Sequence, residues 1–100
     1  MEGLVETELR YLPDAPVRVS VRKRGSKYDI DDQGEAVRLA GKPPGWLEVA
    51  RAVVEEDALN VNRAGVVFVS TFREDSVEPL AQRIGATSKA VYDALLELDE

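Results

Sequence analysis

The sequence predicts a single α+β domain in which two β-hairpins pack against helices. Three observations lead to this prediction. Residues 17–30 and 59–70 each contain two strand-like runs separated by a turn signal, whereas residues 46–58 carry an apolar stripe at helical spacing. Residues 76–98 repeat the helical spacing. The expected order is a helix, a hairpin, two helices, a second hairpin and a C-terminal helix or helix pair.

Length and composition support one domain over residues 1–100. The chain has 100 residues, of which 44% are hydrophobic and 32% are charged, and this is enough for one core. We expect an N-terminal helix or arm at 1–13, an α+β core at 17–74 and a C-terminal helical segment at 76–99. No apolar run approaches the roughly 20 residues that span a bilayer, and the acidic N-terminus lacks the layout of a signal peptide. These features predict a soluble cytoplasmic protein without a membrane partner.

Residue types that are absent from the chain exclude several kinds of chemistry. There is no cysteine, which excludes disulfides and thiol catalysis. There is no histidine, which removes the commonest general base and the commonest transition-metal ligand. Neither a glycine-rich phosphate loop nor a nucleophile motif is present. We therefore expect a protein that is not an enzyme and that holds no cofactor.

Residues 2–12 are predicted to form the first helix. Their apolar members fall close to helical spacing, and the proline at position 13 ends the helix. The apolar members are Leu4, Val5, Leu9 and Leu12.

The first hairpin is predicted from the alternation of apolar and polar residues. Valine alternates with polar residues over 17–21, as in a strand with one buried face. After a break, residues 27–31 alternate again, with Tyr28 and Ile30 as the apolar members. A two-residue loop at 24–25, in which glycine supplies the positive φ of a tight turn, brings all apolar residues to one face. The predicted cross-strand pairs are Val21–Tyr28, Val19–Ile30, Ser20–Asp29 and Arg18–Asp31.

A short helix is predicted directly after this hairpin. Asp32 at the N-cap and Glu35 three residues later match a capping box. Gly41 fits the position after the helix, and Pro43 prevents its continuation.

Four carboxylates in this part of the chain are the best candidates for a metal site: Asp29, Asp31, Asp32 and Glu35. Such oxygen ligands suit Mg²⁺ or Ca²⁺, and the nearby Arg24 and Lys27 would suit a metal-dependent nuclease. The alternative explains the carboxylates separately, as cross-strand partners of basic residues and as a helix cap. The calcium-loop pattern is absent, so we expect no metal.

The middle of the chain is predicted to contain the second helix and the second hairpin. Residues 46–58 form the helix, with Trp46 as a core anchor at its start. The hairpin follows at 59–70, with its turn at 62–65. The strand at 66–69 is apolar at every position, so we expect a central strand that is covered on both faces.

Two runs at helical spacing flank residues 84–88. Leu80, Ala81 and Ile84 precede Gly85, and Val91 follows it. This pattern resembles the helix-turn-helix motif of bacterial DNA-binding proteins. The resemblance implies a turn with a left-handed glycine and a recognition helix whose DNA contacts are Ser88, Lys89 and Tyr92. The alternative is a helix pair, or one kinked helix, that packs on the sheet.

A second resemblance covers residues 17–98. The segment YDIDDQGE lies between a strand and helices, and the order of elements is similar to that of a group of small uncharacterised bacterial α+β proteins. This resemblance implies an independently folding unit of bacterial origin, and it implies no activity or ligand.

Charge is unevenly distributed in this sequence, whose net charge is −6. Residues 17–28 carry five basic groups and no acidic group, whereas residues 75–100 carry six acids and two bases. We therefore expect a protein-interaction module that contacts another protein, or a second copy of itself, through an exposed sheet edge or the hairpin tip. The tip residues are Arg22, Lys23, Arg24 and Lys27. The alternative is a DNA-binding regulator that uses the C-terminal helices, which the net charge disfavours.

Overall fold

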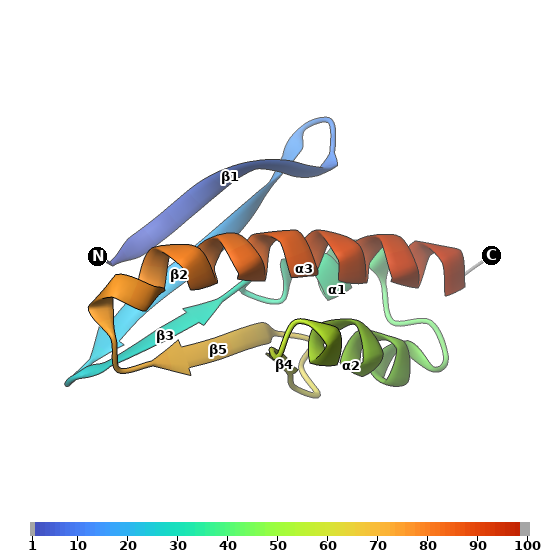
Figure 1. Ribbon diagram of the computed structural model, residues 1–100. Coiled ribbons are helices and arrows are strands. Elements are labelled where there is room, and N and C mark those ends of the chain that lie inside the picture. The colour runs from blue at the N-terminus through green and yellow to red at the C-terminus, as the bar shows by residue number, and fades with distance from the viewer. Residues whose placement is uncertain (1, 99–100) are drawn as a thin grey trace.

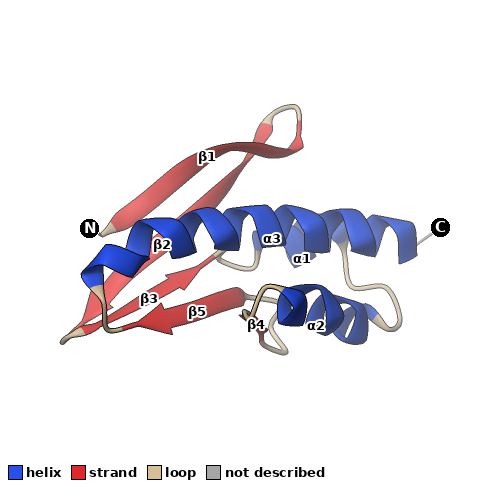
Figure 2. Cartoon of the chain, viewed as in Figure 1, coloured by secondary structure: helices blue, strands red, loops and turns tan. Residues whose placement is uncertain are grey.

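A computed structural model describes residues 2–98 as a two-layer α+β domain. In chain order the elements are β1 (Gly3–Leu12), β2 (Ala15–Arg24), β3 (Lys27–Asp31), α1 (Glu35–Ala40), α2 (Trp46–Glu56), β4 (Asn60–Val61), β5 (Val67–Thr71), a 3₁₀ turn (Glu74–Ser76) and α3 (Val77–Leu98). The five strands form one antiparallel sheet in the order β1-β2-β3-β5-β4. α3 crosses this sheet, and α1 and α2 pack against α3 (Figure 1, Figure 2). The predicted fold class is confirmed.

The core lies between the sheet and α3. The apolar residues that alternate along β2 and β3 are buried on the face toward the helix, as the sequence predicts. Each such side chain contributes about 1.5–3 kcal/mol through burial. The fully buried residues of this interface include Val17, Val19, Val21 and Ile30 from the sheet and Ile84, Val91 and Leu95 from α3.

The β2–β3 register differs from the predicted one by two residues. Val21 lies opposite Ile30, and Arg22 lies opposite Asp29. The loop is at residues 25–26, so Gly25, with φ of 62°, takes the first loop position, where a type II′ turn requires glycine. The predicted loop at 24–25 would instead have required a positive φ at Arg24. Because the shift is even, every side chain keeps its predicted face.

The predicted N-terminal helix is wrong, because residues 3–12 form the edge strand β1. This strand pairs antiparallel with β2, with Val5 opposite Val19. Bulges interrupt the pairing between Glu6 and Arg10 and again before Leu12. The chain turns back after Leu12, which lies opposite Ala15. The strand therefore completes a β1–β2–β3 meander.

The predicted capping box is also wrong. α1 begins after Gly34, whose φ is 72°, and no side chain caps it. Asp32 instead points into the protein, where its Oδ1 accepts the backbone N–H groups of Gly34 at 2.8 Å and Val67 at 2.9 Å. Glu35 forms an ion pair with Arg38 at 2.5 Å. Asp32 therefore joins the start of α1 to β5.

The second helix and the second hairpin are confirmed, and one expectation about β5 is wrong. β4 and β5 pair antiparallel around a turn in which Gly65 has φ of 90°. β5 lies between β3 and β4, but it is covered on one face only: Val67 is buried and Phe68 is 36% exposed. The continuous apolar run thus places an aromatic ring on the open face of the sheet.

α3 is one continuous helix from Val77 to Leu98, without the turn that a helix-turn-helix requires. Gly85 lies inside this helix and faces β1. A Cβ atom at position 85 would lie 2.9 Å from Thr7 Cγ2 and 3.6 Å from Val19 Cγ2. The glycine therefore permits close packing of α3 on the sheet, which is a different role from the one the turn motif suggests. No helix within residues 2–98 is long and apolar enough to cross a membrane.

α2 ends with a non-glycine residue in the left-handed region. Ala58 has φ of 57°. Its N–H donates to Glu55 O at 3.1 Å, while the N–H of the buried Leu59 donates to Val54 O at 2.9 Å. This is the Schellman pattern, in which glycine is the usual left-handed residue.

Replacing Ala58 with glycine is expected to raise the free energy of unfolding by about 0.5–1 kcal/mol, because it removes the clash of Cβ in the left-handed conformation. Urea denaturation measures this change. Ala52→Gly, on the exposed side of the same helix, is the matched control and should lower the free energy of unfolding by about 1 kcal/mol. Equal losses in both variants would contradict the prediction.

Candidate interaction surface

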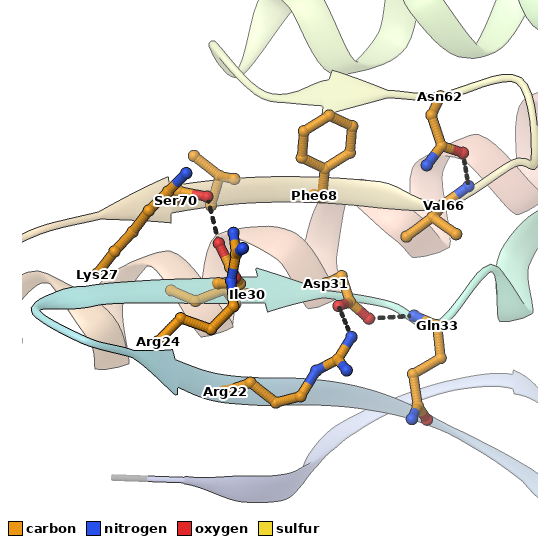
Figure 3. Close-up of a pocket in the computed structure, with 12 residues that line it drawn as sticks. Arg22, Arg24, Lys27, Ile30, Asp31, Gln33, Asn62, Val66, Phe68 and Ser70 are labelled. Atoms are coloured by element: carbon orange, nitrogen blue, oxygen red, sulfur yellow. Dashed lines mark hydrogen bonds and ion pairs between the residues drawn. The ribbon is translucent and has the colours of Figure 1, made fainter.

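The face of the sheet opposite α3 is open over β2, β3 and β5 (Figure 3). A groove of about 730 Å³ lies on this face, and we call it the open-face groove. Its side chains alternate along the strands with the buried valines and isoleucine of the core. The charged and polar lining residues are Arg22, Arg24, Lys27, Asp29, Asp31, Gln33, Asn62 and Ser70, and the apolar ones include Phe68 and Val66.

The two arginines of the groove are more exposed to solvent than the carboxylates with which they pair. Arg22 pairs with Asp31 at 3.9 Å, and the Arg22 side chain is 74% exposed whereas that of Asp31 is 13% exposed. Arg24 pairs with Asp29 in the same way, with 68% and 22% exposure. A molecule that approaches this face therefore meets guanidinium groups first.

Hydrogen bonds hold both carboxylates in place. Asp29 accepts the Nε–H of Arg24 and, at 2.8 Å, the hydroxyl of Ser70 from β5. The bond from Arg24, followed by that from Ser70, lowers the pKa of Asp29 below its usual range. Asp31 accepts the backbone N–H of Gln33 at 2.8 Å. Because hydrogen bonds anchor both carboxylates, the carboxylates fix the arginines above them.

The other end of the groove has an aromatic ring and two amides. Phe68 stands on the open face between β5 and β4 (Figure 3). Asn62 Oδ1 accepts the Val66 N–H at 3.0 Å, so its amide NH₂ remains available as a donor. Gln33, which has φ of 59°, lines the groove after β3. The surface thus combines cations, amides and one exposed ring.

The structure brings together three of the four residues predicted for partner contact. Arg22, Arg24 and Lys27 line the open-face groove. Lys23 points to the opposite face, where its Nζ lies 5.5 Å from the centre of the Tyr28 ring. Alternation along a strand makes this separation unavoidable, because residues 22 and 23 face opposite ways.

The residues predicted for DNA contact are not on one exposed surface. Ser88 is fully buried, and Tyr92 packs against Tyr11 with ring centres 5.3 Å apart. Lys89 pairs with Asp93 at 2.6 Å. Ser88 and Tyr92 therefore belong to the contact between α3 and the sheet.

The four candidate metal ligands are also separated. Asp29 and Asp31 lie in the open-face groove, Asp32 is buried and bonded to the N–H groups of Gly34 and Val67, and Glu35 pairs with Arg38. No group of three acidic residues within the described part of the chain is arranged to hold a metal ion. Each carboxylate contacts the groups described above.

Sequence reasoning missed a buried polar cluster formed by Tyr11, Asp32 and Ser88. All three side chains are at most 5% exposed, and both Tyr11 and Asp32 lie next to Ser88. Tyr11 Oη, Asp32 Oδ2 and Ser88 Oγ have no hydrogen-bond partner among residues 2–98. Burial raises the pKa of Asp32 above its usual range, and burial followed by the charge of Asp32 raises that of Tyr11. This cluster could not be predicted because residues 2–12, which include Tyr11, were expected to form a helix and instead form the strand β1.

No family model, no curated protein and no solved structure gives a significant match to the chain.

Proposed function

We propose that this chain is a protein-interaction module whose open-face groove binds an extended, acidic segment of another protein. The observation that carries the proposal is that the basic side chains of the groove are exposed, whereas the carboxylates paired with them are mostly buried. Two arginines project above the carboxylates that anchor them, in a chain whose net charge is −6. Lys27 adds a third cation, which pairs with no carboxylate within residues 2–98.

The remaining side chains of the groove support an extended protein segment. Phe68 offers an aromatic surface for an apolar side chain, and the amides of Asn62 and Gln33 can bond to backbone groups of the ligand. Successive side chains of an extended segment point in opposite directions. Its carboxylates can therefore contact the arginines while the side chains between them point away from the groove. Electrostatic attraction then sets orientation and association rate more than affinity.

The test is fluorescence anisotropy with a labelled peptide in which glutamate and valine alternate, measured at low and at physiological ionic strength. Arg22→Ser and Lys27→Ser are each expected to weaken binding about three- to tenfold. Added salt should weaken it further, because the cations are exposed. Arg51→Ser, on the exposed side of α2, is the matched control and should leave binding unchanged.

Two outcomes would overturn the proposal. One is the absence of peptide binding at low salt, or binding that is equal in the groove variants and the control. The other is preferential binding of a labelled single-stranded oligonucleotide to the same groove, which would make the partner a nucleic acid.

A further inference from the structure

β1 leaves one edge of the sheet free. It is the first strand in the order β1-β2-β3-β5-β4, and it pairs with β2 along one side. Its other side carries backbone N–H and C=O groups that no strand among residues 2–98 pairs. Three leucines of this strand are also exposed: Leu4 at 58%, Leu9 at 39% and Leu12 at 42%. A long edge with exposed apolar residues is a template for another strand.

The irregular centre of β1 restricts which strand can join it. Pairing with β2 is regular over residues 3–6 and is interrupted between Glu6 and Arg10. Bulges of this kind bend an edge strand and hinder the addition of an ordinary straight strand. A second β1 that runs antiparallel about an axis at Glu8 places the larger of its two irregularities, at residues 7–9, opposite the same residues, while the smaller bulge between Arg10 and Leu12 lies opposite residues 4–6.

We propose that β1 pairs with β1 of a second copy of this chain, antiparallel, about a two-fold axis at Glu8. This register places residues 4–12 of one copy alongside residues 4–12 of the other. It also sets Glu6 of each copy opposite Arg10 of the other. The symmetry produces each contact twice.

The placement of the charged residues supports this register. Within one copy, Glu6 lies opposite Arg18 and Arg10 lies opposite Pro16, so Glu6 and Arg10 occupy the same, open face of the sheet. Residues directly opposite each other across two antiparallel strands must share a face to interact. Glu6 and Arg10 satisfy this condition across the proposed interface.

Neighbouring registers are less complementary. An axis at Thr7 would set Glu6 against Glu8, which is a like-charge pair made twice. An axis at Leu9 would leave the exposed Leu4 beyond the paired strands. The axis at Glu8 has one unfavourable contact, between the two Glu8 side chains, and this contact provides a test.

The dimer is expected to be detectable by sedimentation equilibrium at protein concentrations from about 1 μM to about 1 mM, with a dissociation constant inside this range. Glu8→Gln should strengthen dimerisation about threefold, because it removes the like-charge contact on the axis. With the axis at Leu9, Glu8 would face Arg10 and the same substitution would weaken the dimer.

Charge reversal provides the decisive comparison. Glu6→Arg and Arg10→Glu should each weaken the dimer about tenfold or more, because each creates two like-charge contacts. The double variant should restore the wild-type dissociation constant to within about twofold. Arg51→Glu on α2 is the control that should change nothing, and thermal melts confirm that each variant folds.

A wild-type chain and a Glu8→Gln variant that both stay monomeric at the highest concentration would overturn the proposal. A dimer that ignores the reversals at positions 6 and 10, or that the double variant fails to restore, would place the interface elsewhere and overturn it as well.

Discussion

Replacing Asp32 with alanine is expected to lower the free energy of unfolding by about 3 kcal/mol, measured by urea denaturation at neutral pH. The Oδ1 atom of Asp32 accepts two backbone N–H groups, from Gly34 and from Val67. Asp32 is 1% exposed, so water cannot replace the lost acceptor for the buried Val67 N–H. Leaving buried donors without partners costs more than an ordinary hydrogen bond contributes.

Asp32→Asn is the matched control, because it keeps the acceptor oxygen and removes the charge. Its free energy of unfolding should lie within about 1 kcal/mol of the wild-type value at neutral pH. Equal losses in the alanine and asparagine variants would show that the two N–H bonds do not explain the role of Asp32.

The same pair of proteins tests the pH dependence. Burial raises the pKa of Asp32, so the folded state binds a proton more readily than the unfolded state does. The stability that protonated Asp32 contributes is therefore complete at acidic pH and is lost as the pH rises through the raised folded-state pKa. Asp29 and Asp75, whose pKa values are lowered, act in the opposite direction, because their contribution is lost as the pH falls. Subtracting the Asp32→Asn curve from the wild-type curve cancels these groups and should leave the decline due to Asp32.

Gly65→Ala is expected to cost about 3 kcal/mol and to lower the melting temperature by roughly 12–24 °C. Gly65 has φ of 90°, where a side chain is strained. A Cβ atom there would lie 2.8 Å from Val37 Cγ1 and 2.9 Å from Val37 Cβ. Val37 is fully buried in α1, so it has no open space into which to move.

Gly25→Ala separates the backbone effect from the clash. Gly25 also has a positive φ, of 62°, but a Cβ atom there would have no neighbour within 4 Å. This variant should cost about 1 kcal/mol. Combining Gly65→Ala with Val37→Ala should then cost less than the sum of the two single changes, because the smaller side chain makes room for the added methyl group. Strict additivity would contradict a contact between the two positions.

The sequence predicted the inner face of the sheet better than its register. Alternation of apolar residues decides which face a side chain takes, and the two-residue shift of the β2–β3 register leaves that result intact. The strand β1 could not be recognised in the same way. Its bulges break the period of two, and the leucines at positions 4, 9 and 12 then imitate helical spacing.

The candidate site was predictable only in part. The basic character of residues 22–27 is visible in the sequence, and three of the four expected residues line the open-face groove. The position of Phe68 was not predictable, because a continuous apolar strand normally implies cover on both faces. Ser88 and Tyr92 were misplaced because Gly85 suggests a turn, whereas its role depends on how closely α3 approaches Thr7. Such a distance between segments is not encoded in local spacing.

The position of α3 has a consequence for how the chain acquires its structure during synthesis. One helix covers β1, β2, β3 and β5, yet all of these strands precede it along the chain (Figure 1). A nascent chain that ends before α3 exposes the apolar face of an unfinished sheet, and unpaired apolar strands favour aggregation. The strands therefore depend on contacts with residues 77–98, which are synthesised last. Folding is completed late, because these contacts join distant parts of the chain.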